Sequence, residues 1–107
     1  MSALIKKHVS FFRVLTTTSS KLQRKALLDT ITHDQLTALT EITYNVLKGN
    51  LPITPVQKKL LKRHVKLYLL IGDPKRSYKS KKKALCRQGQ AIVTLLKSTE
   101  ARLKHFL

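Results

Sequence analysis

Three short motifs mark where helices begin in this chain. In each, a Ser or Thr is followed three residues later by Gln, at residues 20–23, 32–35 and 54–57. The hydroxyl accepts a hydrogen bond from a backbone N–H of the first helical turn, and the Gln side chain reaches back to the capping residue. The third motif also places Pro55 at the first helical position, where a missing N–H costs nothing. Helices are therefore predicted to begin just after residues 20, 32 and 54.

Glycines and prolines mark where these helices end. Gly49 and Asn50 follow Lys48, and the run Gly72-Asp73-Pro74 ends the helix that begins after Thr54. We predict an all-α protein, a compact bundle of five helices at residues 3–15, 21–30, 33–48, 55–71 and 80–106. The last helix is long and is expected to break near Gly89, because a glycine inside a helix costs about 1 kcal/mol relative to alanine.

Apolar residues at helical spacing predict the faces that pack inwards. In the third helix these are Leu36, Leu39, Ile42, Val46 and Leu47. In the fourth they are Val56, Leu60, Leu61, Val65, Tyr68 and Ile71, and in the fifth Leu85, Ile92, Leu95, Leu96 and Leu103.

Positive charge is the strongest indication of function. The chain has 107 residues, which predicts one basic helical domain, and it carries 22 Lys and Arg against 5 acids, a net charge of +17. Most of this charge lies after residue 50, on one face of the fourth helix and in a predicted basic loop at 73–83. The candidate nucleic-acid-binding residues are Lys58, Lys59, Lys62, Arg63, Lys66, Lys75, Arg76, Lys79, Lys81, Lys82, Lys83 and Arg87.

Such an excess of cations favours an anionic partner, and nucleic acid is the usual one. Lysines outnumber arginines and act as point charges, which predicts binding to the phosphate backbone without base reading. Only Tyr78 lies within a basic cluster, so a stacking platform for single strands is not expected. The alternatives are a ribosomal or other RNA-binding structural protein, a basic capsid-associated adaptor that binds an acidic protein, and a membrane-surface protein.

No arrangement of residues predicts an enzyme, a metal site or a cofactor. The acids Asp29, Asp34, Glu41, Asp73 and Glu100 show no paired spacing, and His8, His33, His64 and His105 have no partner at ligand spacing. Cys86 is expected to be a half-buried small residue rather than a nucleophile. A single cysteine fits a reducing compartment, and neither a transmembrane segment nor a signal-peptide core is expected. We therefore expect an intracellular protein, and residues 75–83 also have the character of a nuclear-localisation signal.

The stretch 22–96 resembles the small basic proteins of Polinton and adintovirus-type elements, which are compared with the core protein X of adenoviruses. The matching residues are 24–28 (RKALL), Gln35-Leu36, Ala38-Leu39, Glu41-Ile42, Asn45, Leu47-Lys48-Gly49-Asn50, Pro52-Ile53-Thr54-Pro55, Gln57-Lys58-Lys59, 79–83, Gln88-Gly89 and Leu95-Leu96. Two departures are Gln90, where the family usually has a second glycine, and the polar tail 97–107. The resemblance implies a virion core protein that condenses double-stranded DNA, located in the virion and the host nucleus.

Overall fold

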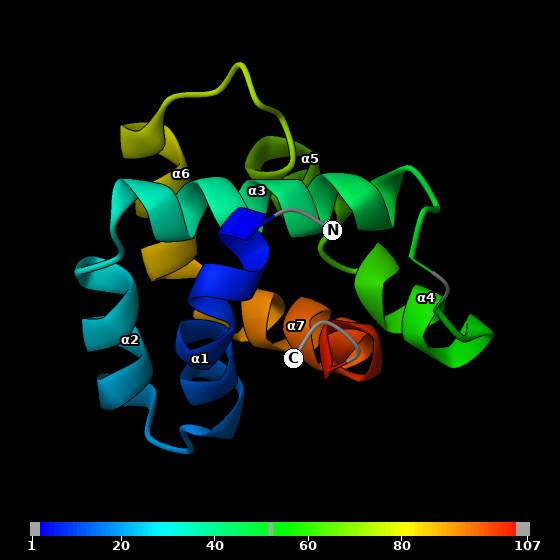
Figure 1. The fold of residues 1–107 in the computed structure, drawn as a ribbon, viewed down its shortest axis with the longest axis horizontal. Coiled ribbons are helices and arrows are strands. Elements are labelled where there is room, and N and C mark those ends of the chain that lie inside the picture. Colours follow the sequence, from blue (N-terminus) through cyan, green and yellow to red (C-terminus); the bar gives the residue numbers. More distant parts are fainter. Residues whose placement is uncertain (1–2, 52, 105–107) are drawn as a thin grey trace.

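The computed structural model describes residues 3–51 and 53–104 (Figure 1). Within these residues the secondary structure is entirely helical, which confirms the all-α class. The helices are α1 (Ala3–Thr17), α2 (Lys21–Asp29), α3 (His33–Leu47), α4 (Pro55–Lys62), α5 (Val65–Ile71), α6 (Tyr78–Arg87) and α7 (Gly89–Lys104). The prediction of five helices was wrong, because the fourth and fifth predicted helices are each divided in two. Residues 105 and 106, predicted as helical, lie outside the described residues.

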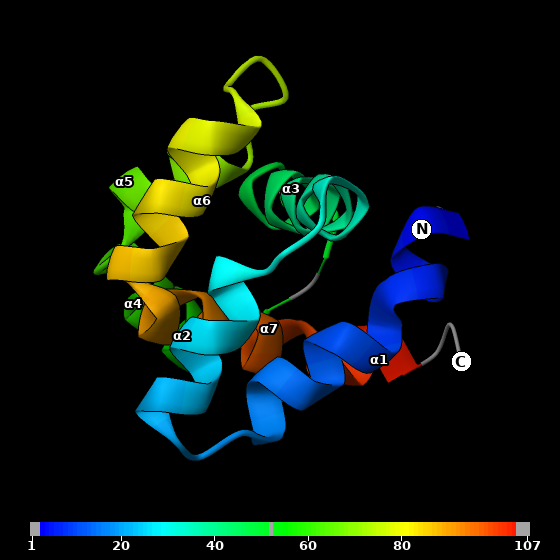
Figure 2. The same ribbon diagram turned by 90° about the vertical axis from the view of Figure 1, so that its left-hand side faces the viewer.

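Helix α3 crosses the molecule and packs against α1 and α5 (Figure 1). Helix α7 packs against α1 and α4, and α2 packs against α6. Side chains such as Ile5, Leu39, Ile71 and Leu95 are fully buried where these helices meet. Figure 2 shows that α4, α5 and α6 lie along one side of the molecule and α1 lies on the opposite side. This arrangement puts the two basic helices α4 and α6 on the same side of the molecule.

Side chains cap four of these helices at their first turn. Thr32 and Thr54 form both hydrogen bonds of the predicted boxes with Gln35 and Gln57. Ser20 accepts a bond from the Gln23 N–H, but the reciprocal bond is not made. Ser77 caps α6 by accepting a bond from the Ser80 N–H, a start that the sequence analysis did not predict. Helix α6 therefore begins at Tyr78, and only the first part of the predicted loop 73–83 is a loop.

The fourth predicted helix breaks at Arg63 and His64, where His64 has φ −123° and ψ 25°. In one straight helix Leu61 and Leu67 would point about 120° apart. With the break between them, both side chains are buried. It also leaves Val56, Leu60 and Val65 exposed, so their predicted inward position was wrong.

The fifth predicted helix breaks at Gln88, and α7 begins at Gly89, as the sequence predicted. A Cβ atom on Gly89 would lie 3.0 Å from Cδ1 of Leu28, so glycine allows α2 to approach this corner closely. Leu85, Ile92, Leu95 and Leu96 are buried as predicted. The side chain of Leu103 lies outside the described residues. In α3 the predicted inward residues are buried or half-buried except Leu47, which is exposed.

Tyr68 ties α5 to α7. Its side chain is buried, and its hydroxyl donates a hydrogen bond of 2.7 Å to the carbonyl oxygen of Ala91. Burial raises the pKa of Tyr68 to about 12, because the ionised phenolate would lose its hydration. The hydrogen bond from this hydroxyl joins α5 to α7.

Candidate nucleic-acid interface

Helix α4 presents four cations on its outer face. Leu61 is its buried side chain, and Lys58, Lys59, Lys62 and Arg63 at its end are all exposed. At about 100° per residue these cations span an arc of about 140°, whose centre lies about 130° from Leu61. The stripe predicted from the sequence is therefore present, but it ends at the break after Arg63.

Lys66 belongs to a second surface, because it lies beyond that break, on α5. It lines a groove of about 590 Å³ together with Lys48 and Arg76, between the end of α3, α5 and the loop that follows. Lys48 places its ammonium 5.6 Å from the ring centre of Tyr44 on the same groove. This groove thus combines three cations with an exposed aromatic ring.

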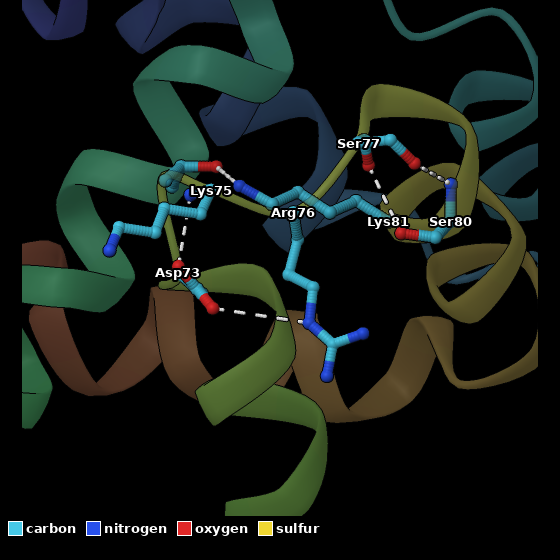
Figure 3. A network of polar contacts seen from close by, with 7 residues as sticks. Asp73, Lys75, Arg76, Ser77, Ser80 and Lys81 are labelled. Carbon is cyan, nitrogen blue, oxygen red and sulfur yellow. Dashed lines mark hydrogen bonds and ion pairs between the residues drawn. The ribbon is translucent and has the colours of Figure 1, made fainter.

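The loop between α5 and α6 carries Lys75 and Arg76, both exposed (Figure 3). Asp73 holds this loop in shape, since its Oδ1 accepts a 2.9 Å hydrogen bond from the backbone N–H of Lys75. Its Oδ2 lies 3.9 Å from Nε of Arg76, a long and exposed ion pair. Such pairs contribute little to stability, so Arg76 can turn towards another anion.

Helix α6 has a basic outer face and a buried inner face. Lys79, Lys83 and Arg87 are exposed at i, i+4 spacing, with Lys82 half-buried beside them. Leu85 and Lys81 lie on the inner face and are buried.

Lys81 is a correction to the predicted set. Only 4% of its surface is exposed, and its ammonium donates a 2.8 Å hydrogen bond to Oγ1 of Thr40 on α3. Burial lowers its pKa, while the nearby Asp73 carboxylate opposes that shift. Lys81 points inwards because it shares the helical face of Leu85, so it is not part of the outer cationic surface.

Three cations of α2 adjoin α6 and were missed by the sequence analysis. Lys21, Arg24 and Lys25 line a groove of about 770 Å³ with Arg87. The Nη1 atom of Arg24 donates a 2.6 Å hydrogen bond to Oε1 of Gln90, across the groove. The sequence contains these residues, but only the packing of α2 against α6 shows that they continue the basic surface.

We use the name basic side for the surface of α4, α5, the loop 72–77 and α6. Its cations are the predicted residues without Lys81, namely Lys58, Lys59, Lys62, Arg63, Lys66, Lys75, Arg76, Lys79, Lys82, Lys83 and Arg87. Asp73 is the one acid in the sequence between residues 55 and 87. The whole chain has five acids for 22 cations, so internal pairing one to one would leave at least 17 cations unneutralised.

Cys86 lies on α6 and contacts α2. Its half-buried thiol donates a 2.9 Å hydrogen bond to Oδ1 of Asp29 on α2. Burial raises the pKa of the Cys86 thiol, and the bond to Asp29 raises it further, against the opposing charges of Lys82 and Lys25. The protonated thiol is a poor nucleophile, which agrees with the predicted half-buried role.

The part of the chain that the structure describes contains no group of three or more His, Cys, Asp or Glu placed to hold a metal ion. None of the helices in those residues is long and apolar enough to cross a membrane.

Comparisons of this chain with protein-family models, with curated proteins and with solved structures found no match.

Proposed function

We propose that this protein binds the phosphate backbone of nucleic acid without reading its sequence, through the basic side. The observation that supports this most strongly is that eleven cations belong to α4, α5, α6 and the loop before α6, which lie along one side of the molecule (Figure 2), and that Asp73 is the one acid in this part of the sequence. Eight of the eleven are lysines, which act as point charges and suit phosphates better than base edges.

The net charge matches the charge of a duplex of the protein's own length. The Cα atoms extend about 30 Å along each axis. Duplex DNA carries one negative charge per about 1.7 Å of its axis, so a 30 Å length carries about 18 charges. The eleven cations of the basic side could neutralise more than half of these charges, and the net charge of the whole chain is +17. Neutralisation on this scale is what a genome-condensing or virion core protein requires, and we propose double-stranded DNA as the preferred partner.

The surroundings of Tyr78 argue against single-strand binding by base stacking. Its hydroxyl donates a hydrogen bond to the carbonyl of Ile31, and its ring stacks on His33 at a centroid distance of 5.5 Å. The ring is thus engaged within the fold. Tyr44 is an exposed ring beside cations, but a stacking platform needs several exposed rings in succession.

The proposal is tested by gel shifts with duplex DNA, single-stranded DNA and folded RNA. One variant replaces Lys59, Lys62 and Lys83 of the basic side with Gln. A matched control replaces Lys6, Lys7 and Arg13 with Gln, because these exposed cations lie on α1, on the opposite side. Both variants lose the same charge.

We expect the basic-side variant to reduce the slope of log Kobs against log salt by about 2.7, with little change in the control. Equal losses in both variants would contradict the location of the interface. Tighter binding to folded RNA would select the RNA-binding alternative. If an acidic protein but no nucleic acid is bound, the adaptor alternative would replace the proposal.

A further inference from the structure

A small hollow between α3 and α6 has the chemistry of an anion site. It measures about 160 Å³ and lies apart from the outer face of α6. Its polar lining comes from Lys81 and Tyr78 of α6, Arg76 of the loop, and His33, Thr37 and Thr40 of α3. None of the described residues that line it is acidic. The two grooves are several times larger, so this hollow suits a small ion rather than a base or a peptide.

The buried ammonium of Lys81 is the feature that calls for a ligand. The side chain is only 4% exposed, and Thr40 is the acceptor that its ammonium reaches among the described residues. An ammonium has three N–H donors, and burying a charge is costly unless it is paired and fully hydrogen-bonded. Asp73 does not supply that pairing directly, because its oxygens hold the N–H of Lys75 and face Arg76 (Figure 3).

Arg76 supplies a second positive charge at the same hollow. Its side chain is 61% exposed, and its side-chain partner among the described residues is Asp73, at 3.9 Å. A guanidinium offers parallel N–H donors that match the oxygens of a phosphate, and an ammonium adds a point charge. We propose that this hollow binds a phosphate group between the Lys81 ammonium and the Arg76 guanidinium. This site shares Arg76 with the basic side, but Lys81 is not part of that surface, and the site does not require the proposed backbone binding.

The test measures the thermal unfolding midpoint, Tm, in inorganic phosphate and in chloride at equal ionic strength. Lys81→Met removes the buried charge with little change in volume, and Lys83→Met removes one charge from the exposed face of the same helix. Phosphate at ten times its Kd would multiply the folding equilibrium constant about elevenfold and raise Tm by several degrees. We expect this rise in the unaltered protein and in Lys83→Met, and its loss in Lys81→Met.

A second pair of variants keeps the test decisive if Lys81→Met fails to fold. Arg76→Gln alters an exposed loop residue, and Arg87→Gln is its match on the exposed face of α6. A smaller phosphate effect in Arg76→Gln alone supports the site. Equal phosphate responses in the variants of both pairs would overturn it and would mean that water satisfies Lys81.

Dimethyl phosphate, used as a second probe, distinguishes the sources of the phosphate. If it raises Tm as inorganic phosphate does, the site accepts a backbone phosphodiester. If only inorganic phosphate acts, the site takes a free or terminal phosphate. Gel shifts with duplex DNA report on the basic side separately, so either proposal can fail without the other.

Discussion

Raising the pH from 10 to 12 is expected to remove stability through Tyr68. Its pKa lies at about 12 in the folded protein, against an ordinary value of 10.0. The hydroxyl therefore stays protonated in the folded state while the unfolded chain ionises, so stability present below pH 10 is lost as the pH approaches 12. This rise in the pKa of Tyr68 corresponds to about 2.7 kcal/mol of folding free energy, and most of that stability is lost by pH 12.

Tyr68→Phe isolates this effect from the lysines, which also titrate in this range. At pH 7 the variant should be less stable by about 1 kcal/mol, because it loses the hydrogen bond to Ala91. Near pH 12 it should be the more stable protein, because phenylalanine does not ionise. Urea unfolding followed by circular dichroism at pH 7, 10, 11 and 12 gives both free energies. A difference in unfolding free energy between the two proteins that stays constant from pH 10 to 12 would show that Tyr68 does not cause the loss of stability.

Two further predictions concern packing and the thiol. Gly72→Ala should lower the free energy of unfolding by about 1 kcal/mol, measured in urea, because its Cβ would lie 2.9 Å from Cδ1 of Leu47 and 3.3 Å from the backbone nitrogen of Tyr44. An unchanged value would mean that Leu47 moves aside without cost. Asp29→Asn should speed the reaction of Cys86 with a disulfide reagent at pH 8, because Asp29 raises the pKa of the thiol. A slower reaction would show that Asp29 does not hold the proton.

The starts of α2, α3 and α4 were predictable because a cap is local. The bond from a Ser or Thr to a backbone N–H three residues away needs no other part of the fold. The break at His64 was not predictable in this way, since the residue type is compatible with a helix. The break coincides with a change in the buried face, from Leu61 before it to Leu67, Tyr68 and Ile71 after it.

The candidate site was predictable in composition but not in detail. The sequence identified twelve candidate cations, of which ten are exposed in the structure and Lys82 is half-buried. Charge counts could not show that Lys81 points inwards, because α6 has five basic residues and no continuous apolar stripe that would mark its inner face. Nor could they join α2 to α6, since that surface depends on packing between helices that are distant in sequence.

The salt dependence of binding to duplex DNA is the sharpest test of phosphate-backbone binding by the basic side. Two duplexes of equal length and unrelated sequence would be titrated with the intact protein between 50 and 200 mM salt. If about six to ten cations of the basic side contact phosphates, affinity should fall about 10³–10⁵-fold over this range, with the same slope for both duplexes. An affinity that barely changes with salt, or that differs strongly between the two sequences, would contradict backbone binding.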